Sequence, residues 1–167
     1  MKKIRIQPEW KISDFHNLDY FLTTHKDKIL LDQYVNFGHN RDSMTLYNCH
    51  EPSYMPNCVH DYIKPQFDFL EHIAFAINLF KPGQYLPIHA DIFGKYMKLY
   101  DVKFENIVRY IIMLEDSLPG QILQIESKCI GEWNSGDCFG WKYNQRHAFY
   151  NFSMKDRYAI QVTGTLK

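Results

Sequence analysis

The sequence predicts a mainly β protein, a double-stranded β-helix of the jelly-roll kind with a few N-terminal helices. Residues 73–165 consist of about eight short apolar runs separated by turn residues, with no helical period between them. Twelve Tyr, twelve Phe and three Trp supply the large side chains of a core. A length of 167 residues fits a single domain, in which residues 1–73 would support a β core at 74–167.

The charge balance argues against nucleic-acid and membrane partners. Nineteen Lys and Arg offset nineteen Asp and Glu, so no net field attracts a polyanion. No apolar run approaches the ~18 residues of a membrane-spanning helix, and the first residues do not resemble a signal peptide. We therefore expect a cytoplasmic protein whose partner is a small molecule or a peptide or protein substrate. The sequence does not indicate its oligomeric state.

The first seventy residues have a mixed pattern. Apolar residues over 14–25, after Ser13 or Asp14 as a cap, predict a short amphipathic helix. Residues 29–35 favour an early strand. Residues 38–60 are rich in Asn, His, Asp, Pro and Ser, which predicts a long ordered loop. Pro65 is suited to the first turn of a helix that would extend to about His72.

The strands of the β core follow from residue 73 onward. They are expected at Ile73–Phe80, Tyr85–His89, Ile107–Leu114, Gln121–Glu126, Cys129–Trp133, Asp137–Trp141, His147–Phe152 and Arg157–Thr165. The long connection Phe93–Asn106 interrupts them. Loops of this length in compact domains are often lids, so this connection and the segment Asn36–His60 are candidates for substrate selection.

A candidate metal site begins at His89-Ala90-Asp91. Side chains at positions i and i+2 of a strand point to the same face, so the imidazole and the carboxylate can converge. His147 stands beside the predicted strand 147–152. Two His and one carboxylate form the facial triad of non-haem Fe(II) oxygenases, which leaves metal positions free for other ligands. His-x-Asp alone is a weak signal, because such tripeptides arise often by chance.

The context of this triad resembles the Fe(II)/2-oxoglutarate-dependent dioxygenases, in particular the small prolyl-hydroxylase-like and aspartyl/asparaginyl-hydroxylase-like members. The resemblance covers roughly residues 74–166. Its features occur in the expected order and are Pro82-Gly83, His89-x-Asp91, the Gly136-Asp137 turn before His147, and Arg157-Tyr158-Ala159-Ile160.

The resemblance implies an enzyme that hydroxylates an amino-acid or protein side chain or another small molecule, with Fe(II), 2-oxoglutarate and O₂ as cofactors. His89, Asp91 and His147 would bind the metal. Arg157 would hold the distal carboxylate of 2-oxoglutarate, because a guanidinium grips a carboxylate with two parallel hydrogen bonds. Many relatives place Ser or Thr two positions after this arginine, whereas this chain has Ala159.

Five further residues are candidates for the cosubstrate pocket, and the competing interpretations are a packing aromatic for Tyr85 and a surface ion pair for Arg109. Tyr85 precedes the metal motif on the same strand, and Arg109 is in phase with the inward positions of 107–114. Gln161 lies four residues after Arg157 on the same strand face. Asn78 would line the pocket, as would Trp141, although a tryptophan there more often belongs to the core.

Two alternatives remain open at this stage. A cupin-like metal-dependent isomerase or lyase would use the same barrel without 2-oxoglutarate, and a non-catalytic jelly-roll binding module would need no intact triad. The cysteines and histidines at Cys49, His50, Cys58 and His60 form a second cluster. Its spacing does not match structural zinc sites, and the sequence gives it no role.

Overall fold

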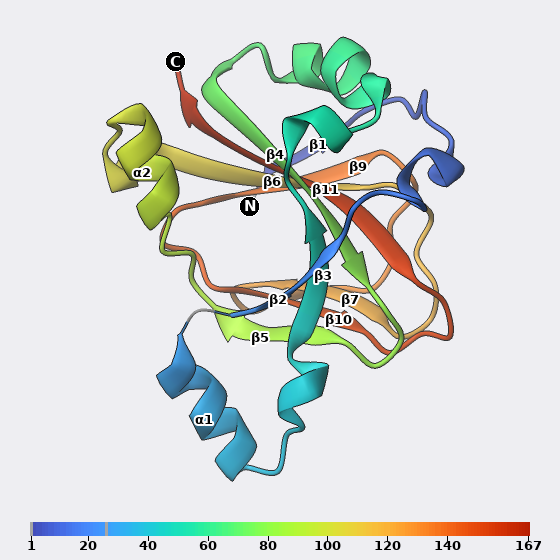
Figure 1. The fold of residues 1–167 in the computed structure, drawn as a ribbon, viewed down its shortest axis with the longest axis vertical. Coiled ribbons are helices and arrows are strands. Elements are labelled where there is room, and N and C mark those ends of the chain that lie inside the picture. The colour runs from blue at the N-terminus through green and yellow to red at the C-terminus, as the bar shows by residue number, and fades with distance from the viewer. Residues whose placement is uncertain (1, 26) are drawn as a thin grey trace.

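The computed structural model describes residues 2–25 and 27–167, whose strands form two facing antiparallel sheets (Figure 1). The larger sheet has the order β1-β9-β6-β11-β4-β3-β2, and the smaller one the order β5-β10-β7-β8. The strands are β1 Lys2–Arg5, β2 Phe21–Thr24, β3 Thr45–Cys49, β4 Leu70–Phe80, β5 Tyr85–His89, β6 Ile107–Met113, β7 Gln121–Ile125, β8 Lys128–Ile130, β9 Asp137–Lys142, β10 His147–Asn151 and β11 Arg157–Leu166. From β4 onward the chain alternates between the sheets, with β5, β7, β8 and β10 in the smaller sheet and β6, β9 and β11 in the larger one. This arrangement confirms the predicted jelly roll.

The core between the two sheets is apolar and largely aromatic. Inward-facing residues of both sheets bury one cluster, which includes Leu46, Phe80, Ile111, Met113, Leu123, Ile125, Trp133, Phe139, Trp141, Phe149 and Ala159. Alternate residues of the long strand β11 point to opposite faces, so Ala159 joins this interior while Ile160 joins a second core. Burial of these side chains holds the sheets together and leaves one end of the sandwich for a cavity.

The second core covers the outer face of the larger sheet. There the N-terminal segment packs Phe15, Met55, Val59, Ile63 and Phe67 against the sheet. The same segment adds three strands to that sheet, since β1 pairs with β9, β2 with β3, and β3 with β4. Residues 1–73 therefore contribute to the larger sheet as well as covering it.

The β core agrees closely with the sequence interpretation. The strand expected at Tyr85–His89 has these bounds in the structure. The other seven expected strands are present with ends shifted by a few residues, the largest differences being the earlier start of β4 and the earlier end of β8. Short apolar runs between turn residues were a sufficient signal because every one of these strands except β8 contains buried residues.

The N-terminal predictions were mostly wrong. The helix expected over 14–25 is a short 3₁₀ turn at Ile12–Phe15 followed by β2, because pairing with β3 fixes the later residues in an extended form. The strand expected over 29–35 is instead helix α1, Lys28–Asn36. Asp27 caps this helix by accepting a hydrogen bond from the Leu30 amide at 3.0 Å.

The connecting segments hold more regular structure than expected. The presumed loop 38–60 contains β3, which is short and partly polar. The helix expected from Pro65 to His72 is a 3₁₀ turn, Lys64–Phe67, and β4 then begins at Leu70. The connection 93–106 contains the short helix α2, Gly94–Tyr100, which lies at one end of the sandwich (Figure 1).

Two turns depend on glycine. Gly83 has a φ of +82° in the turn between β4 and β5, and Gly136 has a φ of +86° before β9. These are left-handed conformations that side chains disfavour. At Gly136 a Cβ atom would also lie 2.0 Å from the Ile6 carbonyl oxygen. Both turns are among the motifs noted in the sequence. The first turn leads into β5, which carries His89, and the second leads into β9, which carries Trp141.

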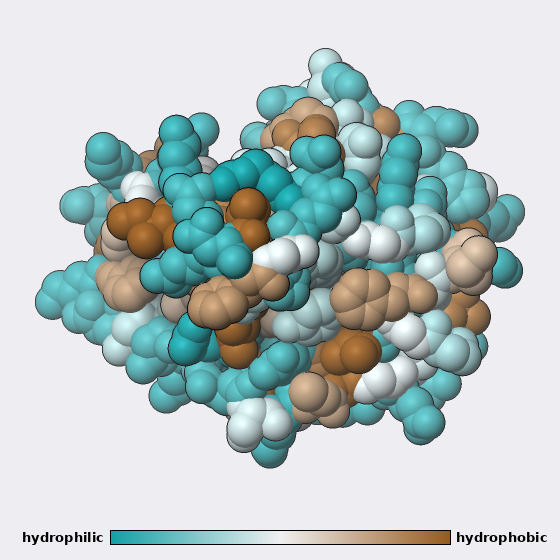
Figure 2. All heavy atoms as spheres, turned by 90° about the horizontal axis from the view of Figure 1, so that it is seen from below, coloured by the Kyte–Doolittle hydropathy of each residue, from teal (hydrophilic) through white to brown (hydrophobic). Residues whose placement is uncertain are grey.

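The surface and the cysteines complete the description. Figure 2, the view from below, shows apolar residues in several groups between hydrophilic ones. Within 2–25 and 27–167, no helix is long and apolar enough to cross a membrane. All four cysteines are free. Cys49 is buried in the outer core, while His60 is exposed and contacts the Pro52 carbonyl.

Candidate metal centre

The three residues of the predicted triad meet at one end of the smaller sheet. His89 ends β5 and His147 begins β10, and these two residues are paired directly across the strands. Asp91 lies two residues beyond His89, just outside the strand. One ligand atom of each residue lies within 4.8 Å of the others, and no other such group occurs in the described part of the chain.

Backbone hydrogen bonds set the tautomers of both histidines. The Nδ1 atom of His89 lies 2.7 Å from the Pro87 carbonyl oxygen, and that of His147 lies 3.2 Å from the Gln145 carbonyl oxygen. A carbonyl oxygen only accepts, so each Nδ1 carries the proton and each Nε2 presents its lone pair. This is the arrangement that a metal-binding imidazole requires.

Burial keeps these imidazoles neutral. It lowers the pKa of His89 to about 3, with His147 adding to the effect. Burial likewise lowers the pKa of His147, although Asp91 opposes the shift. Both rings are therefore unprotonated at neutral pH and can coordinate without first losing a proton.

Asp91 is ionised and only partly paired. Its Oδ1 accepts a hydrogen bond from Arg109 Nη1 at 2.6 Å, while its Oδ2 lies 3.6 Å from His147 Nε2. Among the described residues, that Oδ2 is buried without a hydrogen-bond partner. Burial alone would raise the pKa of Asp91, but Arg109 and the two imidazoles outweigh it and hold the pKa below its usual value.

This donor set fits a divalent metal. Two neutral imidazole nitrogens and one carboxylate oxygen suit a borderline ion such as Fe(II), and the unpartnered Oδ2 is a buried anionic oxygen that a cation would satisfy. The group is therefore a candidate metal-binding triad in a jelly roll.

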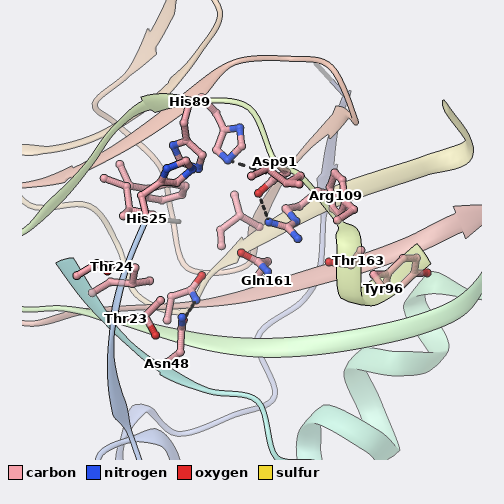
Figure 3. Close-up of a pocket in the computed structure, with 18 of the residues that line it drawn as sticks. Thr23, Thr24, His25, Asn48, His89, Asp91, Tyr96, Arg109, Gln161 and Thr163 are labelled. Atoms are coloured by element: carbon pink, nitrogen blue, oxygen red, sulfur yellow. Dashed lines mark hydrogen bonds and ion pairs between the residues drawn. The ribbon is translucent and has the colours of Figure 1, made fainter. Parts of the chain in front are cut away.

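The triad opens into a cavity of about 560 Å³ between the sheets (Figure 3). Its walls come from both sheets and from the start of α2. The lining residues are Thr23, Thr24, His25, Leu46, Asn48, Asn78, Phe80, Leu86, His89, Asp91, Ile92, Phe93, Gly94, Lys95, Tyr96, Arg109, Ile111, Trp141, His147, Phe149, Gln161 and Thr163. A cavity of this size accommodates a small molecule, and its mixture of rings and amides can hold a polar one.

Four of the expected pocket residues lie on this cavity. Arg109 from β6, Gln161 from β11, Asn78 from β4 and Trp141 from β9 all line it. Arg109 contacts the triad through its hydrogen bond to Asp91, and its guanidinium carbon is 4.6 Å from the centre of the Phe93 ring. The roles that the sequence suggested for these residues remain predictions.

Arg157 lies elsewhere in the interior. Arg157 is not among the described residues that line the cavity. Phe80 and Phe149 do line it, and the centres of their rings lie 5.9 Å and 4.2 Å from the Arg157 guanidinium carbon. These rings therefore separate the guanidinium from the cavity. Trp133, at 4.7 Å, completes the aromatic enclosure, and Arg157 also borders a second cavity of about 210 Å³.

The Arg157 side chain has no acidic partner in the described structure. It is 3% exposed, its Nη2 contacts the Met113 sulfur at 3.2 Å, and its Nε and Nη1 are buried without partners. Burial lowers the pKa of Arg157 to about 9. A buried cation without an anion is costly, which makes this group a candidate for a carboxylate supplied by a ligand.

Tyr85 requires a correction. Its hydroxyl lies 2.7 Å from Nδ1 of His39, and its side chain packs in a small cluster with Leu31 and Met44. The described residues around the cavity do not include it. The sequence placed Tyr85 on the strand entering the metal motif, but the side chain projects from the face of that strand that packs against the N-terminal segment.

The sequence interpretation missed residues contributed by the N-terminal segment. Thr23 lies in β2, His25 follows β2 directly and Asn48 lies in β3, and all three line the cavity (Figure 3). No motif marks them, because they reach the site only through the pairing of β2 with β3 and of β3 with β4. The polar composition of 38–60 indicated a loop and gave no sign of a strand.

Comparison with known proteins locates no family. No family model matches this chain, and no curated protein matches it. Among solved structures, a predicted oxalate decarboxylase from Thermotoga maritima is 13% identical, with a TM-score of 0.45 over 73% of this chain and 82% of that chain. KdgF from Halomonas sp. is 11% identical, with a TM-score of 0.43 over 73% and 82%. A cupin protein from Bacteroides fragilis is 13% identical, with a TM-score of 0.41 over 57% and 68%. The candidate metal-binding triad therefore rests on its own geometry.

Proposed function

We propose that this chain is an Fe(II)- and 2-oxoglutarate-dependent oxygenase that hydroxylates an amino-acid or protein side chain or another small molecule. The observation that carries the proposal is the convergence of two neutral imidazoles and one unpartnered carboxylate oxygen on a cavity large enough for cosubstrate and substrate. Three protein ligands are fewer than octahedral Fe(II) takes, so further ligands would come from the cavity.

Each site residue would have a defined task. His89, Asp91 and His147 would hold the metal, and Asp91 would offset part of its charge. Bound Fe(II) would supply O₂ activation coupled to the conversion of 2-oxoglutarate into succinate and CO₂. Arg109 would fix the orientation of Asp91 through their 2.6 Å hydrogen bond. Trp141 beside His147 would keep bulk water from the reacting atoms.

The distal carboxylate of 2-oxoglutarate would pair with a buried arginine. Arg157 is the first choice, because its guanidinium retains two unpartnered nitrogens among the described residues. A carboxylate in the cavity reaches it only if the Phe149 or Phe80 ring turns aside, since those rings separate the two. Arg109 already faces the cavity and is the second choice.

The same aromatic separation favours an alternative. If Phe80 and Phe149 keep their positions, the cations among the described lining residues are Arg109, which is bound to Asp91, and the exposed Lys95, so no buried guanidinium in the cavity is free to hold a carboxylate. A cupin-like metal-dependent isomerase or lyase, which needs no 2-oxoglutarate, would use such a site. A non-catalytic binding module would require neither the metal nor turnover.

Anaerobic titration followed by turnover separates these functions. The full chain is loaded with Fe(II) without oxygen and titrated with 2-oxoglutarate, and succinate is then measured in air with a panel of amino acids and peptides. The oxygenase proposal expects saturable 2-oxoglutarate binding that requires Fe(II), and succinate release that a substrate accelerates. Asp91→Ala serves as the control without a metal site. Fe(II) binding with no effect of 2-oxoglutarate would favour the isomerase or lyase instead.

A further inference from the structure

A third histidine stands beside the metal triad. The ring centre of His25 lies 4.3 Å from that of His89, which in turn lies 4.4 Å from that of His147. His25 follows β2 directly and lines the same cavity (Figure 3). Within the described ranges, however, the group of converging ligand atoms consists of His89, Asp91 and His147 without it. His25 is therefore adjacent to the metal position without belonging to the ligand set.

The backbone gives His25 the opposite tautomer from the two ligating histidines. Its Nδ1 accepts a hydrogen bond from the backbone N–H of Asp27 at 3.1 Å. An N–H group only donates, so Nδ1 must carry the lone pair and, in the neutral ring, Nε2 carries the proton. The triad histidines present Nε2 lone pairs, whereas His25 presents an Nε2–H.

With Nδ1 occupied by the Asp27 amide, the polar hydrogen of the neutral His25 ring is on Nε2. A neutral donor next to a metal stabilises negative charge on a neighbouring ligand without repelling the metal itself.

The geometry points to His25 as a positioning residue that donates a hydrogen bond from Nε2 to a small anionic or oxygen ligand carried by the metal. Such ligands include carboxylates and small anions, such as azide, that bind at metal positions the protein leaves free. This role rests on the metal triad of the proposed function but is independent of 2-oxoglutarate. It assigns chemistry to the residue that follows β2, for which the sequence alone indicated no functional role.

The test uses the full chain loaded with Co(II) at fixed neutral pH, with azide as the probe ligand. Co(II) binding and azide binding are followed separately through the visible bands of the metal. His25→Phe should leave Co(II) affinity within about threefold, because no ligand is lost, and should weaken azide binding about tenfold or more, because a hydrogen bond to a charged group is lost. His25→Gln keeps a donor near the position of Nε2 and should restore most of the azide affinity.

Two matched controls accompany these variants. His50→Phe changes a surface histidine that follows β3 and packs on Phe21 of the neighbouring strand β2, and should alter neither affinity. Asp91→Ala should lose Co(II) binding. Unchanged azide affinity in His25→Phe would overturn the inference, as would a His25→Gln protein that binds azide no better than His25→Phe.

Other outcomes also decide the question. A loss of Co(II) affinity in His25→Phe comparable with that in Asp91→Ala would make His25 a ligand, contrary to the inference. A wild-type chain that binds no Co(II) would overturn the triad and this inference together. Failure of 2-oxoglutarate binding alone would overturn only the proposed oxygenase function, since the azide result does not depend on it.

Discussion

Asp91 interacts with both Arg109 and His147, so a substitution of Asp91 has two separate effects. One carboxylate oxygen accepts from Arg109, and the other faces His147 at 3.6 Å without a hydrogen-bond partner among the described residues. Its removal would take away a metal ligand and also leave the Arg109 guanidinium unpaired. Because both side chains are only 14% exposed, the second effect is a matter of folding stability.

Asp91→Ala should therefore reduce two measurable quantities. We expect Fe(II) affinity to fall by more than about 100-fold, because the only anionic ligand is lost. We also expect the free energy of unfolding of the metal-free protein to fall by about 3–5 kcal/mol, the usual cost of leaving one member of a buried ion pair. Calorimetric metal titration and urea unfolding measure the two effects.

The double variant Asp91→Ala/Arg109→Met separates them. It removes the unpaired guanidinium and should recover most of the unfolding free energy while Fe(II) binding stays weak. Wild-type Fe(II) affinity in either variant would contradict the assignment of Asp91 as a ligand.

Arg157 allows an equally direct test of the carboxylate anchor. Arg157→Ala should weaken 2-oxoglutarate binding by two or more decades, since one member of a buried charge pair with the ligand is lost, while Fe(II) affinity stays near that of wild type. Arg157→Lys should recover only part of the loss, because an ammonium lacks the planar fork. Anaerobic 2-oxoglutarate titration measures the effect. If both variants bind as wild type does and Arg109→Met does not, Arg109 is the anchor.

At the scale of elements, helix α2 contributes Gly94, Lys95 and Tyr96 to the lining of the cavity. It has only seven residues, and both flanking residues, Phe93 and Asp101, have positive φ values of 53° and 51°. Such conformations are costly for non-glycine residues and persist where neighbouring contacts hold them. Here Phe93 packs on Arg109, and the Tyr96 hydroxyl donates to the His72 carbonyl oxygen at 2.6 Å.

Replacement of residues 94–103 by a short Gly-Ser connection should abolish substrate-stimulated succinate formation. Fe(II) and 2-oxoglutarate binding should persist, because Phe93 and the triad are retained and only the lining from Gly94, Lys95 and Tyr96 is removed. Tyr96→Phe, which removes only the hydrogen bond to His72, is the milder control. Wild-type stimulation of succinate release by the substrate in the shortened protein would show that α2 does not select the substrate.

The elements also show which parts of this molecule could be predicted. The core strands were predictable because alternation and turn residues act locally. The triad was predictable for a similar reason, since His89 and Asp91 are neighbours and His147 begins a recognisable strand. In contrast, β2 and β3 acquire their form from long-range pairing, and His25 and Asn48 therefore carried no local signal. The side-chain environment of Arg157, enclosed by Phe80, Trp133 and Phe149, was likewise beyond the reach of sequence spacing.

For the whole molecule, the N-terminal strand β1 is one of the two edge strands of the larger sheet. β1 pairs with β9, and Asp137 at the start of β9 connects the two strands. Its carboxylate lies 3.0 Å from Lys3 Nζ and 3.3 Å from Arg5 Nη1, and it accepts from the Asn134 amide at 3.1 Å. Burial alone would raise the pKa of Asp137, but the Asn134 amide and the two cations outweigh it and lower the pKa.

This depressed pKa predicts a pH dependence of global stability. Between the lowered folded-state pKa of Asp137 and the ordinary value near ~4, the unfolded chain binds more protons, so stability increases with pH across that window. The contribution is complete above the unfolded pKa and is lost as the pH falls through the folded one. Since Lys3 and Arg5 are about half exposed, solvent screening keeps it small, and Asp137→Asn should cost about 1–2 kcal/mol at neutral pH. Urea unfolding of both proteins between neutral pH and about pH 3 should show the difference shrinking on acidification. A difference that stays constant with pH would mean that the ionised carboxylate does not hold β1 on the sheet.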